Sequence, residues 1–163
     1  MQAFFAEVIL IGVAIALAVA VASYLITTTH SVQETNPLRM LSIGEDSNLV
    51  ICNTSANWSA VLYFPFIEKG TAPIKLYKVE FENLGSFNIQ YYLVMTQPPD
   101  SSTVCSLTPT QSDGILLRPG DKGYLLIFVP KSLSIPRGIP FYMNVIIYSE
   151  SGELYLTVPV IVQ

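Results

Sequence analysis

Few residues of this 163-residue sequence could carry out chemistry. His30 is the only histidine, and Cys52 and Cys105 are the only cysteines. A single histidine leaves no Ser/His/Asp or Cys/His pair with the spacing that nucleophilic catalysis needs. The sequence also contains no glycine-rich phosphate loop and no cluster of metal-ligand residues. We therefore expect a protein that is not an enzyme and that has neither a cofactor nor a metal site.

The two cysteines predict a disulfide. In an exported domain, a pair of cysteines forms a bridge more often than it stays reduced. A bridge between Cys52 and Cys105 would close a loop of about 50 residues and stabilise the fold by roughly 4 kcal/mol in the chain-entropy model. The alternative, two separate buried thiols, stays open at this point.

Two N-glycosylation sequons lie directly after Cys52. They are Asn53-Thr54-Ser55 and Asn57-Trp58-Ser59. Two sequons within seven residues, in a polar stretch between apolar runs, are typical of a glycosylated surface loop. Asn53 and Asn57 are therefore predicted glycosylation sites, provided that the chain reaches a compartment that glycosylates proteins.

The charged residues argue against nucleic-acid binding. The chain has 8 Lys and Arg against 12 Asp and Glu, a net charge of -4, so no basic surface for phosphates is expected. The acids are scattered, so we interpret the pairs Glu45-Asp46 and Glu80/Glu82 as solvated charges of strands or turns. The alternative at Glu45, Asp46 and Asn48 is a calcium site, although these residues form no specific calcium-binding pattern. A hydrophobic content of 51% with only 12% charged residues also excludes a disordered chain.

Much of the apolar excess lies near the N-terminus. Residues 3–26 contain one charge, Glu7, and no Lys or Arg precedes Arg39. As a helix, this segment would be roughly 36 Å long, which is enough to cross a bilayer. Small and large apolar residues mix on every face, so the helix must be buried in lipid or in a protein assembly.

Three interpretations of this segment compete. A cleavable signal peptide has a basic start and a shorter apolar core, although the small residues before Ser23 could be a cleavage site. A plain membrane anchor normally carries Lys or Arg on its cytoplasmic flank. We favour the third, a helix that first lies in the membrane and later packs with copies of itself, after removal of a basic leader.

Glu7 is the residue of this helix that most needs an explanation. A carboxylate within an apolar helix is costly in lipid and indicates a function. Its partner would be the α-amino group of a neighbouring chain or the positive end of its own helix; the alternative is simple solvation at the headgroup level. The predicted assembly residues are Phe4, Phe5, Glu7, Val8, Leu10, Ile11, Ile15, Leu17, Tyr24 and Leu25.

The rest of the chain is predicted to be all β. We expect the helix to end by Asn36, because Pro37 disfavours helical geometry there, so that residues 1–36 form the helix and 37–163 an outer domain. The spacing of the apolar runs predicts an immunoglobulin-like sandwich. Its candidate strands are 38–43, 48–53, 60–66, 74–83, 87–95, 103–107, 115–117, 123–129, 141–149 and 153–162.

Details of these strands make finer predictions. Residues 78–82 alternate, so one face of their strand should be buried and the other exposed. The continuous apolar runs 124–129 and 145–148 predict strands that are covered on both faces. Arg118-Pro119-Gly120-Asp121 predicts a turn, Ser151-Gly152 a terminal hairpin, and Pro159 an edge or bulge.

This layout resembles an archaeal type IV pilin or a related filament subunit. The resemblance rests on Ala3-Phe4-Phe5-Ala6-Glu7, on the apolar run up to Ile26 and on the all-β remainder. It implies that a peptidase removes a basic leader, that the helices bundle into a filament core and that glycosylated β domains cover the outside. Family members with an acid at the fifth mature position use it near the N-terminal amine, and Glu7 is fifth when counted from Ala3.

The expected function is therefore that of a structural subunit of an extracellular type IV pilus-like filament, which polymerises through its N-terminal helix and serves adhesion. Its partners would be copies of itself, the membrane before assembly, and surfaces or other cells, with no nucleic acid. The alternative is a membrane-anchored β-sandwich that binds a partner in the cell envelope or in archaellum machinery. A weaker alternative is a secreted enzyme or binding domain that begins near Ser23.

Overall fold

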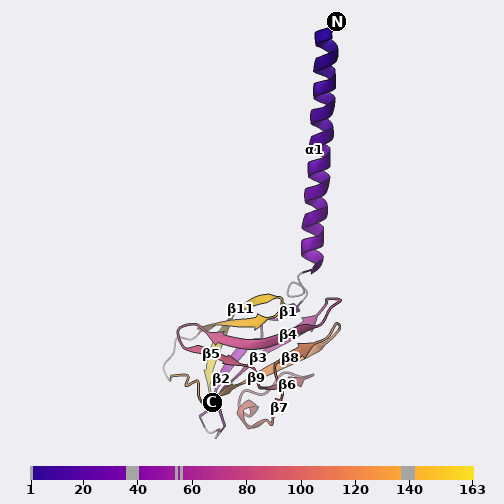
Figure 1. Cartoon of the computed structure of the whole chain (residues 1–163). Helices are drawn as coiled ribbons and strands as arrows, with labels where there is room; N and C mark the ends of the chain where they lie inside the picture. The colour runs from indigo at the N-terminus through magenta and orange to yellow at the C-terminus, as the bar shows by residue number, and fades with distance from the viewer. Residues whose placement is uncertain (1, 36–40, 54, 56, 137–141) are drawn as a thin grey trace. The chain divides into compact units, whose positions relative to one another are not determined.

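The computed structural model describes residues 2–35, 41–53, 55, 57–136 and 142–163 (Figure 1). For residue 2 and residues 25–35 it describes the backbone alone. The chain divides into two compact units, Met1–Asn36 and Pro37–Gln163. Among the described residues, the first unit is helical and the second is largely β, which confirms the predicted layout of one apolar helix followed by strands.

Helix α1 spans Gln2–Thr35. Its first two thirds consist mainly of Ala, Leu, Ile and Val, and the alanines and leucines favour helix strongly. The helix ends two residues before Pro37, as predicted, because a proline excludes helical geometry at the residue before it.

The β unit contains eleven described strands and one short 3-10 helix. In chain order these are β1 (Leu41–Ile43), β2 (Asn48–Ile51), β3 (Trp58–Glu68), β4 (Ile74–Phe81), β5 (Gly85–Asn88), β6 (Tyr91–Met95), η2 (Val104–Ser106), β7 (Thr110–Gln111), β8 (Ile115–Leu117), β9 (Lys122–Pro130), β10 (Tyr142–Ser149) and β11 (Gly152–Val162).

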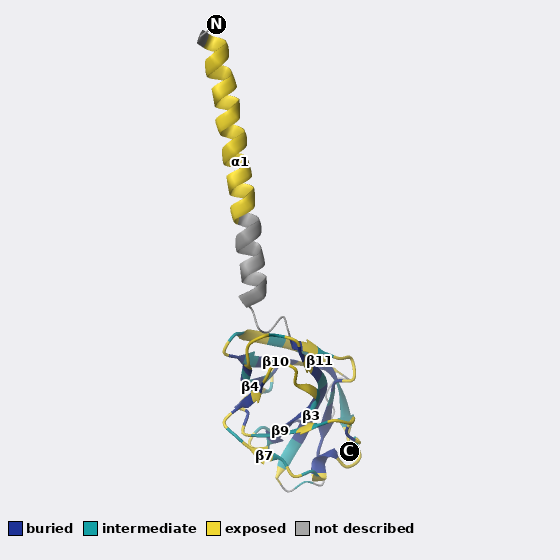
Figure 2. Cartoon of the chain, turned by 90° about the vertical axis from the view of Figure 1, so that its right-hand side faces the viewer, coloured by how far each residue is buried: buried dark blue, intermediate teal, exposed yellow. Residues whose placement is uncertain are grey.

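Strand β11 joins two layers of strands. Its first part pairs antiparallel with β10, up to Pro159, and Val160–Val162 then pair in parallel with β2. One layer has the order β5-β4-β10-β11, with β8 also on β4; the other has the order β2-β3-β9-β6-β7, with β1 on β3. Figure 2 shows β4, β10 and β11 on one side of the unit and β3, β9 and β7 on the other. The immunoglobulin-like arrangement itself stays a prediction.

The main hydrophobic core lies between these two layers. Leu62 and Phe64 of β3 and Ile127 of β9 belong to the same buried cluster as Val79 of β4 and Ile147 of β10. All five side chains have no exposed surface. Burial of side chains of this size stabilises a fold by about 1.5–3 kcal/mol each, so the β unit has a core of its own.

A second core covers the opposite face of β3 and β9. Val61 and Tyr63 of β3 and Leu126 and Phe128 of β9 pack there against η2 and its flanking segment. Successive residues of these strands therefore alternate between two buried environments. This confirms the prediction that the apolar run 124–129 is covered on both faces, since residues 125–129 are all buried.

The same prediction is wrong for residues 145–148 in β10. Val145 and Ile147 are buried, whereas Ile146 and Tyr148 are half-exposed. Among the described residues, no segment covers the outer face of the layer that contains β4 and β10. One face of β10 is therefore buried and the other is exposed to solvent. The predicted alternation in β4 is confirmed, with Val79 and Phe81 buried.

Two other strand predictions are corrected by the structure. Residues 103–107 contain the 3-10 helix η2, because the Asp100 carbonyl accepts hydrogen bonds from the backbone N–H groups of Thr103 and Val104 and turns the chain. Residues 87–95 are two strands, β5 and β6, since the chain crosses from one layer to the other at Ile89 and Gln90. Strand β7 was missed by the sequence analysis, and residues 38–40 and 141 lie outside the described residues.

The predicted turns are confirmed. The Asp121 N–H donates to the Arg118 carbonyl over 3.0 Å, and Gly120 has a φ of +88°, which a glycine adopts without strain. The terminal hairpin turns between Ser149 and Gly152. Pro159 is the last β11 residue in register with β10, at the point where the strand passes to the other layer.

Cys52 and Cys105 form a disulfide. Both are buried in the second core, and their bridge ties the segment around η2 to the end of β2. The bridge closes a loop with a sequence separation of 53 residues.

We expect the double variant Cys52→Ser, Cys105→Ser to lose about 4 kcal/mol of unfolding free energy, because the open loop gains entropy in the unfolded chain. Urea denaturation measures this change. Wild-type protein in excess reductant is the matched control and should unfold at the same urea concentration as the double variant. An unchanged midpoint in both would contradict a stabilising role for the bridge.

Candidate functional site

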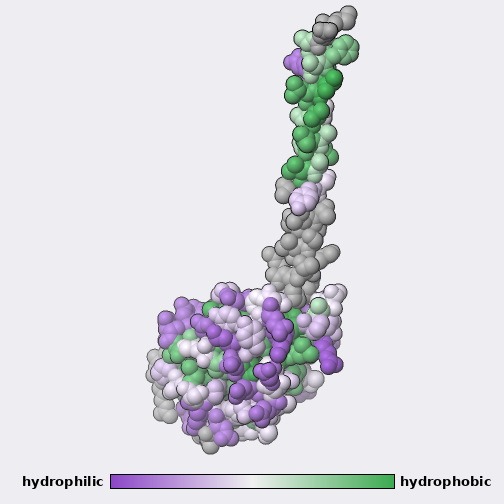
Figure 3. Space-filling view, viewed as in Figure 1, coloured by the Kyte–Doolittle hydropathy of each residue, from purple (hydrophilic) through white to green (hydrophobic). Residues whose placement is uncertain are grey.

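The apolar surface of α1 is the most conspicuous candidate site. Residues Ala3–Tyr24 are long and apolar enough to cross a membrane, and none of them is buried within the structure. Figure 3 shows this segment in green, whereas the visible face of the β unit is a mixture dominated by hydrophilic residues. A helix that is apolar on all sides requires an apolar environment supplied by lipid or by other helices.

The predicted assembly residues lie on all sides of this helix. Their spacing does not restrict them to one stripe; Phe4, Val8, Ile11 and Ile15 share one face at helical spacing, and the others lie around it. The described members are all exposed, and the side chain of Leu25 lies outside the described residues. The exposed members are Phe4, Phe5, Glu7, Val8, Leu10, Ile11, Ile15, Leu17 and Tyr24.

Both predicted glycosylation sites are exposed. Asn53 follows the buried Cys52, and its amide Nδ2 donates a hydrogen bond to the carbonyl of Gln163. A glycan would replace only one of the two N–H bonds on Nδ2 and leave the other available for this contact. Asn57 directly precedes β3. Glycosylation at Asn53 and Asn57 stays a prediction.

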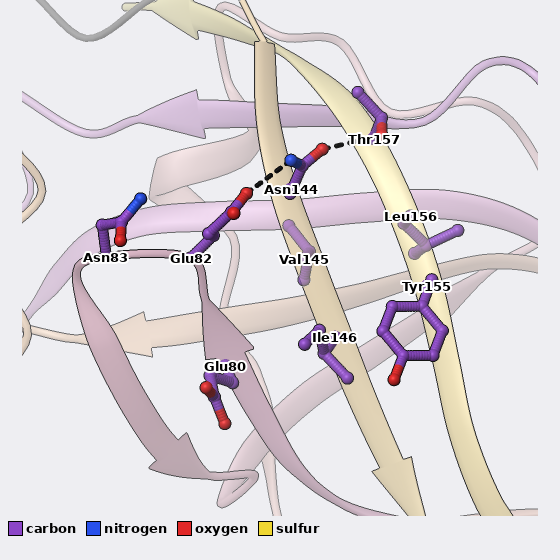
Figure 4. A pocket seen from close by; sticks show the side chains of 9 residues that line it. All are labelled: Glu80, Glu82, Asn83, Asn144, Val145, Ile146, Tyr155, Leu156 and Thr157. Carbon is purple, nitrogen blue, oxygen red and sulfur yellow. Dashed lines mark hydrogen bonds between the residues drawn. The ribbon is translucent and has the colours of Figure 1, made fainter.

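A second candidate site is a hollow of about 420 Å³ on the outer face of β4, β10 and β11. Figure 4 shows Ile146 between Tyr155 on one side and Glu80 on the other, and Glu82 beside Asn144. This arrangement follows from the strand register, which aligns Ile146 of β10 with both Glu80 and Tyr155. The Tyr155 side of the hollow is open to solvent, since this residue is 68% exposed.

Hydrogen bonds hold the polar side chains of the hollow in place. Asn144 donates to Glu82 Oε2 over 2.5 Å and accepts from the Thr157 hydroxyl over 2.9 Å, so one chain of bonds links all three strand segments (Figure 4). The Tyr148 hydroxyl donates to Glu80 Oε2 over 2.8 Å. Because both acids of the lining, Glu80 and Glu82, place carboxylate oxygens at the hollow, it favours a ligand that donates hydrogen bonds and carries positive charge.

The carboxylates also alter the acidity of neighbouring tyrosines. The hydrogen bond to Glu80 raises the pKa of Tyr148 to about 12, since loss of the phenol proton would break that bond and place two negative charges side by side. The hydrogen bond from Tyr155 to Glu153 raises the pKa of Tyr155 for the same reason. Lys78 lies near this group, 3.6 Å from Glu80 Oε2, and partly offsets its charge.

Sequence reasoning missed this hollow. The separation of two residues between Glu80 and Glu82 indicated one exposed face, and Tyr155 and Thr157 have the same spacing. These patterns show which side chains share a face on one strand. They do not show that β4, β10 and β11 are neighbours, because the partner of a strand depends on the whole fold.

Comparisons with known proteins bear on the fold alone. No family model matches the sequence, and no curated protein matches it. Among solved structures, the chain is similar to the copper-bound PCuAC domain from PmoF2, with a TM-score of 0.50 and 16% sequence identity. The match covers 76% of this chain and 94% of that domain. At this identity the likeness carries no information about ligands.

The described donor side chains do not fit a copper site; those of Met1, His30 and Met40 lie outside the described residues. Cys52 and Cys105 are bonded to each other, and the described residues hold no group of three or more His, Cys, Asp or Glu side chains that could bind a metal. Thioether sulfur also binds copper, but Met143 lies in the core between the layers, whereas Met95 packs on the second core. These two methionines belong to opposite faces of the β3–β9 layer and do not converge.

The acidity of Tyr148 gives a test of the hollow's electrostatics. We expect Glu80→Gln to lower the pKa of Tyr148 from about 12 toward the ordinary value near 10, because the amide accepts the bond without a charge. Titration of the tyrosine ring carbons by NMR measures it, with Glu45→Gln as a control.

The same shift predicts a pH dependence of stability. Since the folded protein keeps the Tyr148 proton to higher pH than the unfolded chain, its contribution is complete below about pH 10 and is lost as the pH rises toward 12. A Tyr148 signal that titrates near pH 10 in the wild type would contradict the hydrogen bond to Glu80.

Proposed function

We propose that this protein is a structural subunit of an extracellular type IV pilus-like filament that polymerises through its N-terminal helix. The observation that supports this most strongly is the combination of a fully exposed apolar helix over Ala3–Tyr24 with a β unit whose two cores are complete without it. The β unit does not use the helix as part of either core. The helix can therefore lie in the membrane first and pack against other helices after assembly.

The physical logic of assembly follows from the composition of the helix. An apolar helix leaves lipid only when another apolar environment receives it, and a bundle of identical helices supplies one. The alternating alanines at positions 14, 16, 18, 20 and 22 allow helix backbones to approach closely. A head-to-tail contact that does not close on itself then produces a helical filament. This mode of assembly is the one implied by the resemblance to archaeal type IV pilins.

In this proposal the β unit is the outer domain of the filament and belongs to the immunoglobulin-like class. Its disulfide and its two cores suit a domain that works outside the cell, where no chaperone refolds it. Glycans at Asn53 and Asn57 would add to a surface with few charges. Adhesion to surfaces or other cells is the activity we assign to the filament.

Removal of residues 1–30 tests the proposal. We expect the fragment to be soluble and unable to form filaments, because it keeps both cores of the β unit and loses the apolar helix. Negative-stain images of the full chain should show long fibres, and images of the fragment should show none. Circular dichroism of the fragment provides the control for folding.

The alternative function gives different images. A membrane-anchored binding protein would form no fibres as a full chain, although its fragment would be equally soluble. Fibres formed by the fragment would show that the helix is not the element that polymerises.

Glu7 provides a more selective test. We expect Glu7→Gln to raise the subunit concentration needed for polymerisation by about tenfold or more, because an N-terminal amine desolvated among apolar helices would lose its partner. Glu7→Asp keeps the charge and should retain part of the assembly, while Glu45→Gln removes an exposed carboxylate of the β unit and should change nothing. Sedimentation of filaments measures the concentration, and equal values for all variants would mean that Glu7 is merely solvated.

A further inference from the structure

The β unit has a negatively charged site at one end of β4. Glu80 and Glu82 line the hollow described above, and Glu153 is on the same face, two residues before Tyr155. Lys78 lies 3.6 Å from Glu80 and offsets one of these charges. Glu82 directly follows the last residue of β4.

A positively charged group surrounds the turn between β8 and β9. Lys69, Arg118 and Lys122 are exposed there and form no ion pair within the described part of the chain. The backbone brings them together, because the Gly120 N–H donates to the Glu68 carbonyl over 3.0 Å and the Glu68 N–H donates to the Asp121 carbonyl over 2.8 Å. Two acids lie beside these three cations: Asp121 in the turn, and Glu68, whose buried carboxylate accepts a hydrogen bond from the Gly70 N–H. One positive charge remains in excess, and the exposed charges are mainly positive.

Strand β4 separates the acidic hollow from this basic turn. Ile74, the first residue of β4, pairs with Leu117, which directly precedes Arg118. Glu82 is eight residues further along the chain, which corresponds to about 26 Å of extended strand. The β unit therefore carries opposite charges at two separate places, further apart than the screening length of about 10 Å at 0.1 M salt.

The hollow has the chemistry to receive a long basic side chain. Its aliphatic floor, Ile146, can contact the methylene groups of a lysine or arginine, and the exposed ring of Tyr155 attracts a cation over its face. The carboxylates of Glu80 and Glu82 accept the hydrogen bonds that the charged head donates. A neutral apolar ligand would leave these oxygens without partners.

We propose that the basic turn of one β unit, formed by Lys69, Arg118 and Lys122, docks against the acidic hollow of the next copy in the filament. The inference rests on the proposed function and adds a second contact to the one made by the helices. Such a contact joins two different surfaces and does not pair a surface with itself, so it propagates along a polymer. Its charge complementarity also fixes the orientation of neighbouring outer domains.

Charge reversal in the full-length protein tests this contact. The first variant is Glu82→Lys, and the second is Lys69→Glu with Lys122→Glu. In a filament made of either variant alone, like charges face each other wherever a hollow meets a turn. We therefore expect the subunit concentration needed for polymerisation to rise about tenfold. Thr110→Lys, at an exposed position of β7 on the far edge of the other layer, also adds positive charge but lies away from both surfaces, and it should polymerise like the wild type.

Mixing the two variants isolates the pairing. The altered hollow of the first variant is complementary to the altered turn of the second, and the unchanged hollow of the second fits the unchanged turn of the first. We therefore expect an equimolar mixture to polymerise within about twofold of the wild type. Because a misfolded subunit could not be rescued in this way, the mixture also controls for folding.

The outcomes distinguish this contact from the filament itself. Wild-type fibres together with reversed-charge variants that polymerise normally would overturn the docking contact and leave the filament function intact. Variants that fail alone and also fail when mixed would show that the two surfaces do not pair with each other. A wild-type chain that forms no fibres would overturn both proposals.

Discussion

The apolar surface of α1 is the constraint on which the rest of this molecule depends. Over Ala3–Tyr24 every face of the helix is exposed, and water solvates such a surface poorly. No arrangement of one copy's β unit could cover a helix that is apolar on all sides. The helix must therefore lie in lipid or among other helices, and the β unit must fold without its help.

The β unit satisfies this requirement by covering one layer of strands on both faces. The central strands β3 and β9 contribute alternate residues to the core between the layers and to the second core under η2. The second core exists because the disulfide holds a turn-rich segment against the sheet. Two cores and a bridge give a small domain the stability that a single core of this size seldom supplies.

One face of the β unit is left without cover among the described residues, and this face carries the hollow. Ile146 and Tyr148 on β10 are half-exposed where a third layer would have buried them. Exposed tyrosines beside carboxylates form a surface suited to a cationic partner, and the basic turn at the other end of β4 has the complementary charge. The uncovered sheet face and the apolar helix are the two surfaces that we propose as contacts with other copies of this chain.

The sequence by itself determined the elements whose signals are local. The apolar run of α1, the stop before Pro37, the turn at Gly120 and the alternation in β4 depend on residues close together in the chain, and their positions were predicted correctly. Only the tertiary structure decided that residues 103–107 form a 3-10 helix under a disulfide and that residues 87–95 change layers. It alone brought Glu80, Ile146 and Tyr155 side by side, because strand partnership is a property of the whole fold and leaves no periodicity in any single segment.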